Sequence, residues 1–384
     1  MTIAPPRAAF EALRQGFDPK VTRSHSLAAD AYTDPAWFAA EREAIFAKSW
    51  RWVCHAEKLR ERGAYVATEL AGRPILLVRG RDGELRGFYN VCKHRAHHLL
   101  TGEGKTSGIT CPYHAWTYDL TGQLRAAPHT QHLEDFDKSA ICLDPIRVEE
   151  FCGFIFANLD PNATPLAEQS GDLSAEIMRY APDVGELTFA HRLTYDIRSN
   201  WKNVVDNFLE CYHCHIAHKD FVTLVDMDTY KVTTHGIYSS HMAEAGKAAN
   251  SAYSVENATV RDHAVWWLWP TTCLMRYPGR GNFLVLNVIP LGPDRTLETY
   301  DFYLEEPTPN ADEREAIRYI DEVLQPEDIG LVESVQKGME TPAFRQGRFV
   351  VDPGGSGLSE HAVHHFHGLV LDAYAALYAE EGAA

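Results

Sequence analysis

Two short segments that each combine a cysteine with a histidine constrain this chain more than any other feature. They read Cys92-Lys93-His94 and Cys111-Pro112-Tyr113-His114, and sixteen residues separate them. Each pair supplies one thiolate and one imidazole from a tight turn, so four ligands can converge from two adjacent loops. Two cysteines on one iron and two histidines on the other are the ligand set of a [2Fe–2S] cluster of the Rieske type.

A structural zinc ion is the alternative for these four residues, because two cysteines and two histidines also form a zinc-binding set. A zinc finger usually pairs cysteine with cysteine and histidine with histidine at short spacings, whereas both pairs here are mixed. The spacing therefore favours the iron–sulfur cluster. With imidazoles in place of two thiolates, the cluster has a raised reduction potential and acts as a one-electron relay.

Length and charge bound the class of protein. A chain of 384 residues exceeds the size at which single hydrophobic cores usually stop growing, so we expect two domains. The 53 acidic and 36 basic residues give a formal net charge of −17, which argues against a nucleic-acid partner because nucleic acids bind basic surfaces. We see no apolar leader and no apolar run of about eighteen residues, so the sequence predicts a cytoplasmic protein without a membrane span.

The other cysteines of the chain are not obvious ligands. Cys211 and Cys214 suggest zinc, but their segment offers no clean four-ligand closure. The remaining four stand in apolar or aromatic surroundings, and we expect buried free thiols of a reducing compartment at Cys54, Cys142, Cys152 and Cys273.

Local patterns divide the chain into three parts. Residues 1–45 read as a helical lead-in that packs on the later domain, with Asp34 as the N-cap of a helix and Pro35 in its first turn. Residues 46–162 contain short β-like segments separated by turns, which predicts a small all-β module around the two Cys–His pairs. Residues 163–384 mix helical stretches with strand-like runs, so we expect an α+β chain with the larger α+β domain second.

A second metal site is predicted in the helical pattern of residues 200–218. Two histidines and one carboxylate on one face of an iron leave three positions open for O₂ and substrate. His213 and His218 are five residues apart, about 140° on a regular helix, so both reach one metal only if the helix ends or distorts between them. His215 is a competing ligand, which we rank lower because it points away from His213 in helical geometry.

Carboxylates near this segment complete the prediction. Glu210 lies three residues before His213 and can hold the other imidazole nitrogen, and Asp206 is a weaker candidate for the same role. The third ligand should be a carboxylate from elsewhere in the domain. The acidic pair Glu327-Asp328 is the one we favour, although periodicity alone does not single it out.

Over nearly its whole length the chain resembles the oxygenase α component of Rieske non-haem iron oxygenases. Within that family it is similar to the quaternary-ammonium branch, of the carnitine monooxygenase type and akin to betaine and stachydrine demethylases. The stretches that carry the resemblance are Phe88-Tyr89-Asn90-Val91-Cys92, Cys111-Pro112-Tyr113-His114-Ala115-Trp116, Asn200-Trp201-Lys202-Asn203, Glu210-Cys211-Tyr212-His213, Pro326-Glu327-Asp328, Val332-Glu333-Ser334-Val335-Gln336-Lys337-Gly338 and Ser359-Glu360-His361.

The resemblance implies a role for each predicted ligand. A mononuclear Fe(II) would be held by His213, His218 and Asp328, and Glu210 would bridge His213 to His114 of the partner subunit. Aromatic-ring dioxygenases usually carry Asp at the bridging position, so Glu210 favours the quaternary-ammonium branch. The fold implied for the second domain is an antiparallel sheet with helices, of helix-grip type.

One position departs from the family pattern. The family commonly has Gly where this chain has Ala96, after the first histidine of the cluster. If that turn needs a positive φ, Ala96 costs about 1 kcal/mol of strain, which does not threaten the cluster.

The resemblance also implies a reaction and its partners. NAD(P)H electrons would reach a homotrimer through a separate flavin/[2Fe–2S] reductase, and O₂ would be used to hydroxylate a carbon next to a quaternary nitrogen and break the C–N bond. Carnitine would give trimethylamine and malic semialdehyde. The alternatives are N-demethylation of glycine betaine or stachydrine and, further away, aromatic ring dioxygenation.

An aromatic-rich run in the second domain is a candidate substrate site, because ring faces attract quaternary ammonium groups. In a strand, Trp267 and Trp269 share one face, and Tyr277 lies close in sequence. Core packing explains these residues at least as well. Arg276 and Arg280 are candidate partners for a substrate carboxylate.

Overall fold

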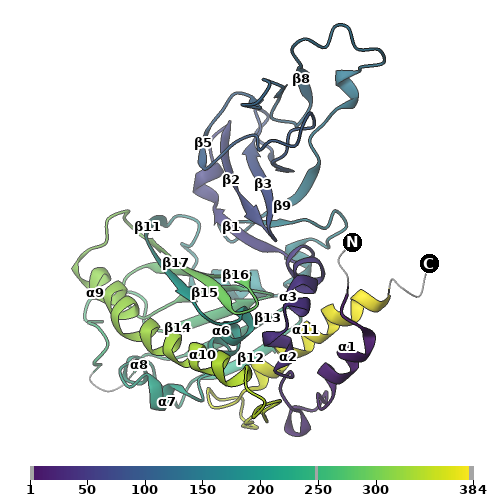
Figure 1. Ribbon diagram of the computed structural model, residues 1–384. Coiled ribbons are helices and arrows are strands. Elements are labelled where there is room, and N and C mark those ends of the chain that lie inside the picture. Colours follow the sequence, from purple (N-terminus) through teal and green to yellow (C-terminus); the bar gives the residue numbers. More distant parts are fainter. Residues whose placement is uncertain (1–3, 247–249, 380–384) are drawn as a thin grey trace. The chain divides into compact units, whose positions relative to one another are not determined.

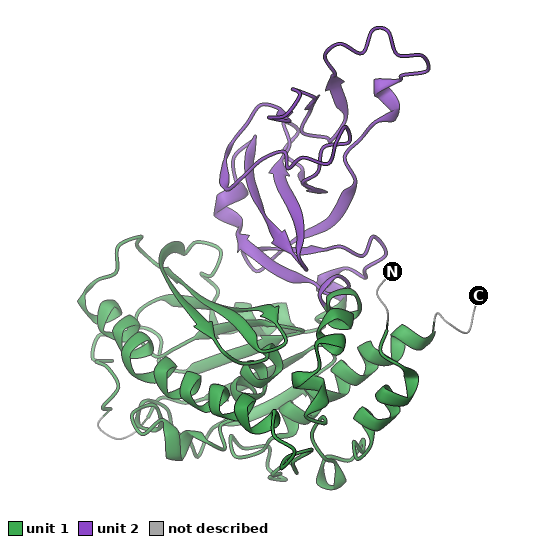
Figure 2. Ribbon diagram, viewed as in Figure 1, with its two compact units in different colours: residues 1–45, 169–384 green, residues 46–168 purple. Residues whose placement is uncertain are grey.

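The computed structural model describes residues 4–246 and 250–379, and it divides into two compact units. The residues up to Ile45 and those from Gln169 onward form unit 1, and Phe46–Glu168 form unit 2 (Figures 1 and 2). Unit 2 thus extends past residue 162, where we expected the boundary. The reason is that Trp50 Nε1 donates a hydrogen bond to Thr164 O at 2.9 Å, which ties the following segment to unit 2.

Unit 2 is an all-β module. Its seven-stranded antiparallel sheet has the strand order β1-β10-β9-β4-β3-β2-β5, and a three-stranded sheet has the order β6-β7-β8. The elements of the module are β1 (Arg51–His55), η3 (Ala56–Leu59), β2 (Ala64–Leu70), β3 (Arg73–Arg79), β4 (Leu85–Tyr89), β5 (Glu103–Lys105), β6 (Ile109–Thr110), β7 (Thr117–Tyr118), β8 (Leu124–Ala126), η4 (Lys138–Ala140), β9 (Pro145–Phe151) and β10 (Phe154–Asn158).

Strand β3 supports a hydrophobic core on each of its two faces. Successive side chains of a strand point to opposite faces, so Ile75 and Leu77 enter one core and Leu76 and Val78 enter the other. All four side chains are fully buried. The second core also contains both cysteines of the predicted cluster, so the side chains of β3 pack in the same core as the two ligand loops.

Unit 1 is built on a second seven-stranded antiparallel sheet, of order β11-β17-β16-β15-β14-β13-β12. An all-β module together with an α+β unit of antiparallel sheet and helices confirms the predicted fold class. The strands are β11 (Thr188–Ile197), β12 (Lys231–His235), β13 (Tyr238–Ala243), β14 (His263–Leu268), β15 (Thr272–Arg276), β16 (Asn282–Gly292) and β17 (Arg295–Leu304).

Helices from both ends of the chain and from its middle accompany this sheet (Figure 1). None of the helices in the described part of the chain combines the length and the apolar character needed to traverse a bilayer. The helical elements are α1 (Arg7–Arg14), η1 (Val21–Arg23), α2 (Asp30–Thr33), α3 (Pro35–Glu41), η2 (Arg42–Phe46), α4 (Leu166–Gln169), α5 (Leu173–Tyr180), α6 (Trp201–Phe208), α7 (Cys214–Ala217), α8 (Phe221–Leu224), α9 (Ala311–Tyr319), η5 (Ile320–Leu324), α10 (Gln325–Met339) and α11 (His361–Ala379).

A continuous helical rod is formed by α9, η5 and α10. Its middle section η5 is a π-helical turn. Pro326 follows directly in the first turn of α10. A proline has no N–H to donate to the carbonyl four residues earlier, so the regular α-helical ladder is interrupted at this point.

A buried ion pair joins the N-terminal segment to the middle of unit 1. Lys202 Nζ on α6 lies 2.5 Å from Glu41 Oε1 on α3, and neither side chain is exposed. Glu41 also accepts hydrogen bonds from Trp201 Nε1, at 2.7 Å, and from the hydroxyl of Tyr374 on α11. A buried charge is tolerated when it is paired and hydrogen-bonded, so this carboxylate fixes three helices against one another.

The free cysteines are only partly where the sequence placed them. Cys54 and Cys273 are buried and Cys152 is half-buried, but Cys142 is exposed, so the prediction of a buried thiol there is wrong. Cys142 pairs through its backbone with Gln123 beside β8, at the rim of the module, and this leaves its side chain outward.

Two histidines are buried in the sheet of unit 1. His241 on β13 and His263 on β14 are 1% and 3% exposed, and burial lowers the pKa of each to about 3. An unfolded histidine titrates near pH 6.5. As the pH falls below that value, the unfolded chain gains a proton that the folded chain does not accept, so folding stability is lost.

Replacing His241 by Gln should therefore weaken the acid sensitivity of unit 1. Between pH 7.5 and pH 5, the wild type should lose about 2 kcal/mol more unfolding free energy than the variant. Urea unfolding followed by tryptophan fluorescence at the two pH values measures this difference. His132→Gln, which replaces an exposed histidine of unit 2, is the control, and equal pH slopes for wild type and His241→Gln would contradict the prediction.

Candidate metal centres and pocket

The two Cys–His loops of unit 2 share one backbone turn. The N–H of Ala96 donates to Cys92 O at 3.0 Å, and the N–H of Ala115 donates to Cys111 O at the same distance. Both alanines have a positive φ, +56° and +57°. The turn at Ala96 therefore does need left-handed backbone, at a cost of about 1 kcal/mol, and the second loop carries the same strain.

The donor atoms of these loops fit a Rieske cluster. Cys92 and Cys111 are each 2% exposed, and the rings of His94 and His114 lie with their centroids 4.6 Å apart. Nδ1 of His114 is buried and has no hydrogen-bond partner among the described residues. Two buried thiols and two adjoining imidazoles, one with a buried unpartnered nitrogen, supply what two bridged irons need.

In unit 1 the break in the helix lies where the second metal site requires it. Helix α6 ends at Phe208, and α7 is a separate short helix with His213 and His218 at its two ends. His218 is 3% exposed, whereas the rival His215 is exposed to solvent. The break brings His213 and His218 together and leaves the side chain of His215 in solvent.

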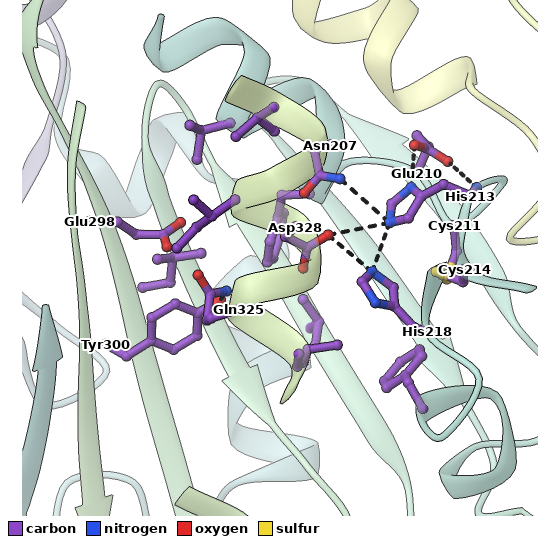
Figure 3. Close-up of a pocket in the computed structure, with 18 of the residues that line it drawn as sticks. Asn207, Glu210, Cys211, His213, Cys214, His218, Glu298, Tyr300, Gln325 and Asp328 are labelled. Carbon is purple, nitrogen blue, oxygen red and sulfur yellow. Dashed lines mark hydrogen bonds and ion pairs between the residues drawn. A yellow bond between two sulfur atoms is a disulfide. The ribbon is translucent and has the colours of Figure 1, made fainter. Parts of the chain in front are cut away.

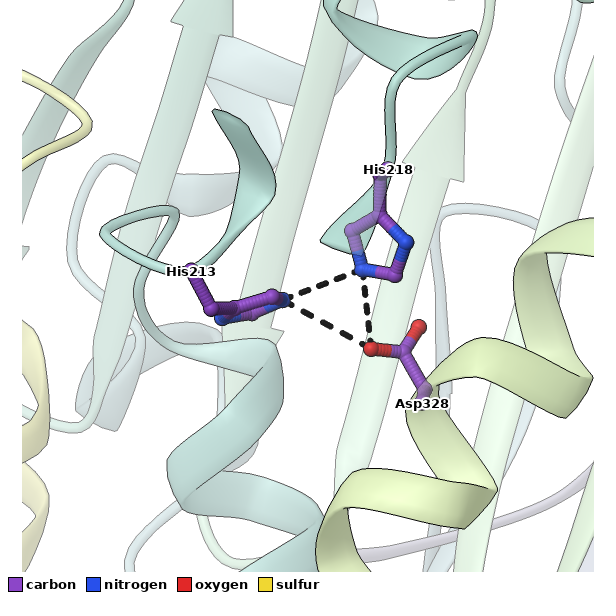
Figure 4. Close-up of side chains that lie close together, drawn as sticks. All are labelled: His213, His218 and Asp328. Carbon is purple, nitrogen blue, oxygen red and sulfur yellow. Dashed lines mark hydrogen bonds and ion pairs between the residues drawn. The ribbon is translucent and has the colours of Figure 1, made fainter. Parts of the chain in front are cut away.

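Three ligand atoms from two distant segments converge on one point (Figure 4). Nε2 of His213 lies 3.1 Å from Nε2 of His218, and Oδ1 of Asp328 on α10 lies 3.0 Å from the latter and 3.6 Å from the former. Two ligands about 2.1 Å from one metal at a right angle are roughly 3 Å apart. The triangle therefore has the size of a site in which two histidines and one carboxylate bind one face of a metal ion.

A carboxylate stands behind each imidazole. Oε1 of Glu210 lies 2.5 Å from Nδ1 of His213, and Oε2 of Glu327 lies 2.8 Å from Nδ1 of His218. Such carboxylates fix the tautomer and orientation of ligating histidines. The sequence predicted the first pair and missed the second, although Glu327 adjoins Asp328. We had weighed Glu327 only as a ligand.

The charges of the set favour a bound cation. Burial by itself would lower the pKa of His213, but hydrogen bonds and the negative charges of Asp328 and Glu210 outweigh burial and raise that pKa to about 10. Burial likewise opposes protonation of His218, and Asp328 and Glu327 raise its pKa. One positive charge is therefore strongly favoured where the three ligand atoms meet, and a divalent metal ion supplies it.

The expectation for Asp206 is corrected, and the structure gives a reason for rejecting zinc at Cys211 and Cys214. Asp206 does not contact His213, because it accepts hydrogen bonds from Tyr32 Oη at 2.7 Å and from His367 Nε2 at 2.9 Å on the other side of α6. Cys211 and Cys214 form a disulfide with each other, with their Cα atoms 4.9 Å apart, so they are not zinc ligands.

A cavity opens beside the three ligand atoms (Figure 3). The empty volume is about 760 Å³ when the open solvent at the mouth is included. The acidic residues that line it are Glu210, Glu298 and Asp328, and no lysine or arginine lines it among the described residues. The sequence missed Glu298, because β17 also contains Arg295 and Asp301 and one more charged residue does not stand out there.

The predicted aromatic substrate residues are mostly elsewhere. Tyr277 lines the cavity, but Trp267 and Trp269 do not. Trp267 is fully buried beyond the cavity, and its ring lies 5.5 Å from that of Phe366 on α11. Trp269 packs against the same two rings, so both tryptophans belong to the core.

The predicted arginines do not reach the cavity either. Arg276 is buried and donates to Asp183 at 2.7 Å. Arg280 lies 3.6 Å from Glu305. Neither is therefore placed to bind a substrate carboxylate in this cavity.

Comparison with known proteins places the two units in one family. Residues 49–137 match the Rieske [2Fe-2S] domain, and residues 184–376 match the catalytic domain of the ring hydroxylating alpha subunit. The carnitine monooxygenase oxygenase subunit of Escherichia coli (strain K12) is 41% identical over 364 residues, covering 94% of this chain and 97% of the relative. The corresponding subunit of Acinetobacter pittii is 39% identical over 341 residues, covering 88% and 92%.

A solved structure of a quaternary ammonium Rieske monooxygenase, described for carnitine oxidation by gut microbiota and inter-subunit electron transfer, has a TM-score of 0.87. It is 36% identical and covers 93% of this chain and 98% of its own. With both units matched, the chain belongs to the Rieske non-haem iron oxygenases as an α subunit, the component that carries a Rieske [2Fe–2S] cluster and a mononuclear iron.

Proposed function

We propose that this α subunit is a monooxygenase that hydroxylates the carbon next to a quaternary nitrogen and so breaks the C–N bond, with carnitine as substrate. The observation that carries the proposal is the charge of the cavity, which is lined by three carboxylates and by no lysine or arginine among the described residues. A cationic head group is attracted to such a lining. The similarity to carnitine monooxygenase subunits supports the same substrate class.

The reaction balances with one O₂, two electrons and two protons. One oxygen atom becomes a hydroxyl on the carbon bound to nitrogen, and the other leaves as water. The resulting carbinolamine loses its hydroxyl proton as the C–N bond breaks, and the bond pair stays on nitrogen. Carnitine then yields trimethylamine and malic semialdehyde.

The residues of the two centres divide the work. When bound, the cluster supplies electrons one at a time and the mononuclear iron supplies the activation of O₂. His213, His218 and Asp328 would hold the iron on one face and leave the side toward the cavity open for substrate. Glu210 would keep the proton of His213 on Nδ1, which aims Nε2 at the metal.

Glu210 is further proposed to link His213 to His114 of the partner subunit in a homotrimer. The solved relative described for inter-subunit electron transfer supports this arrangement by analogy. Membership in a family of oxygenase subunits implies a reductase, and we propose a flavin/[2Fe–2S] reductase that draws on NAD(P)H.

Replacing His218 by Ala should remove the mononuclear iron and leave the cluster. Iron should fall from about three to about two atoms per chain, with acid-labile sulfide and the visible spectrum of the cluster unchanged. His215→Ala is the matched control, since it removes an exposed imidazole from the same short helix. Loss of iron from the control, or retention of all three atoms in His218→Ala, would refute the assignment.

Substrate class should be decided by turnover of the holoenzyme with its reductase, NADH and O₂. We expect trimethylamine from carnitine, at a rate well above any formaldehyde released from glycine betaine or stachydrine. Mass spectrometry of the products separates these outcomes. Formaldehyde as the main product would replace carnitine cleavage by N-demethylation, and a cis-diol from benzoate would end the quaternary-amine proposal.

Replacing Glu210 by Gln should slow electron transfer from the cluster to the mononuclear iron. The slowing should exceed what a loss of His213 orientation alone would cause. Glu327→Gln is the control, because Glu327 has the same relation to His218 that Glu210 has to His213. Loss of such a carboxylate costs about 10- to 100-fold in metal affinity or activity. With both variants iron-loaded, re-oxidation of the reduced cluster by O₂ and substrate should be slowed far more in Glu210→Gln. Equal slowing would argue against the bridge.

A further inference from the structure

Glu298 is a buried carboxylate that has no hydrogen-bond or ion-pair partner in the described part of the chain. It lies on β17, where alternation puts it on the same face as Tyr300, and both residues line the cavity (Figure 3). Glu298 is 3% exposed. Its Oε2 is fully buried without a hydrogen-bond partner, and the side chain forms no ion pair within residues 4–246 and 250–379.

Asp301 and Glu41, two carboxylates buried as deeply in unit 1, are paired, unlike Glu298. Asp301, three residues further along β17, receives Nε and Nη2 of Arg192 at 2.5 and 2.6 Å. Glu41 accepts from a lysine, a tryptophan and a tyrosine. A buried carboxyl without a partner destabilises a fold, so packing alone gives no reason for Glu298.

The surroundings of Glu298 suit a cation that has no N–H to donate. Gln325 Nε2 donates to Tyr300 Oη at 2.6 Å, and Oε1 of Gln325 is buried without a partner in the described part of the chain. The rings of Tyr300 and Tyr277 line the same cavity. Acceptor oxygens and ring faces attract a positive charge that is spread over methyl groups.

We propose that the carboxylate of Glu298 binds the positively charged nitrogen of the substrate. The inference rests on the proposed function for its substrate class and adds the residue that recognises it. A nitrogen held by Glu298 keeps the carbons bonded to it in the cavity that contains His213, His218 and Asp328. Binding of the substrate nitrogen also gives a reason for the presence of Glu298, which the packing of the fold does not require.

The ionisation of Glu298 is consistent with this role. Burial, and secondly the negative charge of Asp328, raise the pKa of Glu298 to about 8. A carboxyl with such a pKa is mostly protonated at neutral pH and is balanced between its two forms at mildly alkaline pH. The arrival of a cation is then enough to hold it in the charged form.

The test compares carnitine with its carbon isostere, in which a tert-butyl group replaces the trimethylammonium group. Calorimetric titration of anaerobic, iron-loaded holoenzyme gives both dissociation constants. The wild type should prefer carnitine, and Glu298→Gln should weaken carnitine binding by about 10- to 100-fold, as for loss of one partner of a buried charge pair. The variant should bind the isostere as the wild type does.

Two further measurements separate charge recognition from a structural effect. The melting temperature of Glu298→Gln should equal or exceed that of the wild type, because the amide removes a buried unpartnered acid. Glu305→Gln, which changes an exposed carboxylate directly after the same strand, should alter neither dissociation constant.

Several outcomes would overturn the inference. These are unchanged carnitine affinity in Glu298→Gln, equal weakening of carnitine and isostere, and a wild type that does not prefer carnitine. If instead the wild type prefers carnitine and Glu298→Gln loses that preference, but no amine product forms during turnover, the inference stands and the proposed reaction fails.

Discussion

The charge pair between Glu41 and Lys202 sets the position of helix α6, and the catalytic side of the molecule depends on that helix. One turn later on α6, Asp206 accepts hydrogen bonds from Tyr32 and His367. The N-terminal segment and α11 therefore each contact α6 at two successive turns. The chain leaves α6 only a few residues before its first metal ligand. The lead-in of the first forty-five residues is therefore part of the catalytic unit, although the whole of unit 2 separates it from that unit in sequence.

The two metal centres obtain their negative charge in different ways. In unit 2 it comes from two thiols set in a hydrophobic core and presented by two strained but identical turns. In unit 1 it comes from carboxylates, one as a ligand and one behind each imidazole. The second arrangement leaves an acidic, open cavity beside the metal site.

Local sequence was sufficient for residues whose roles depend on short spacing or helical geometry. The convergence of the two Cys–His pairs, the break between His213 and His218 and the contact of Glu210 with His213 were predicted in this way, and the family pattern pointed to Asp328. Local sequence was not sufficient where the role of a residue depends on which way its side chain faces in the folded unit. Helical periodicity gave Asp206 and strand alternation gave Trp267, but packing against distant helices turned both away from the cavity. Glu298 was missed because an isolated acid in a strand does not reveal that it lacks a partner.

The π-helical turn η5 has a consequence for the evolution of the site. Such a turn is an α-helix with one residue inserted, and the wider turn absorbs that residue, so the helix beyond it is not rotated by the roughly 100° that one more α-helical residue would add. The turn lies directly before α10, which carries Asp328. A homologue that lost one residue here and closed the turn to regular α-helix would therefore keep the same face of α10 toward the two histidines.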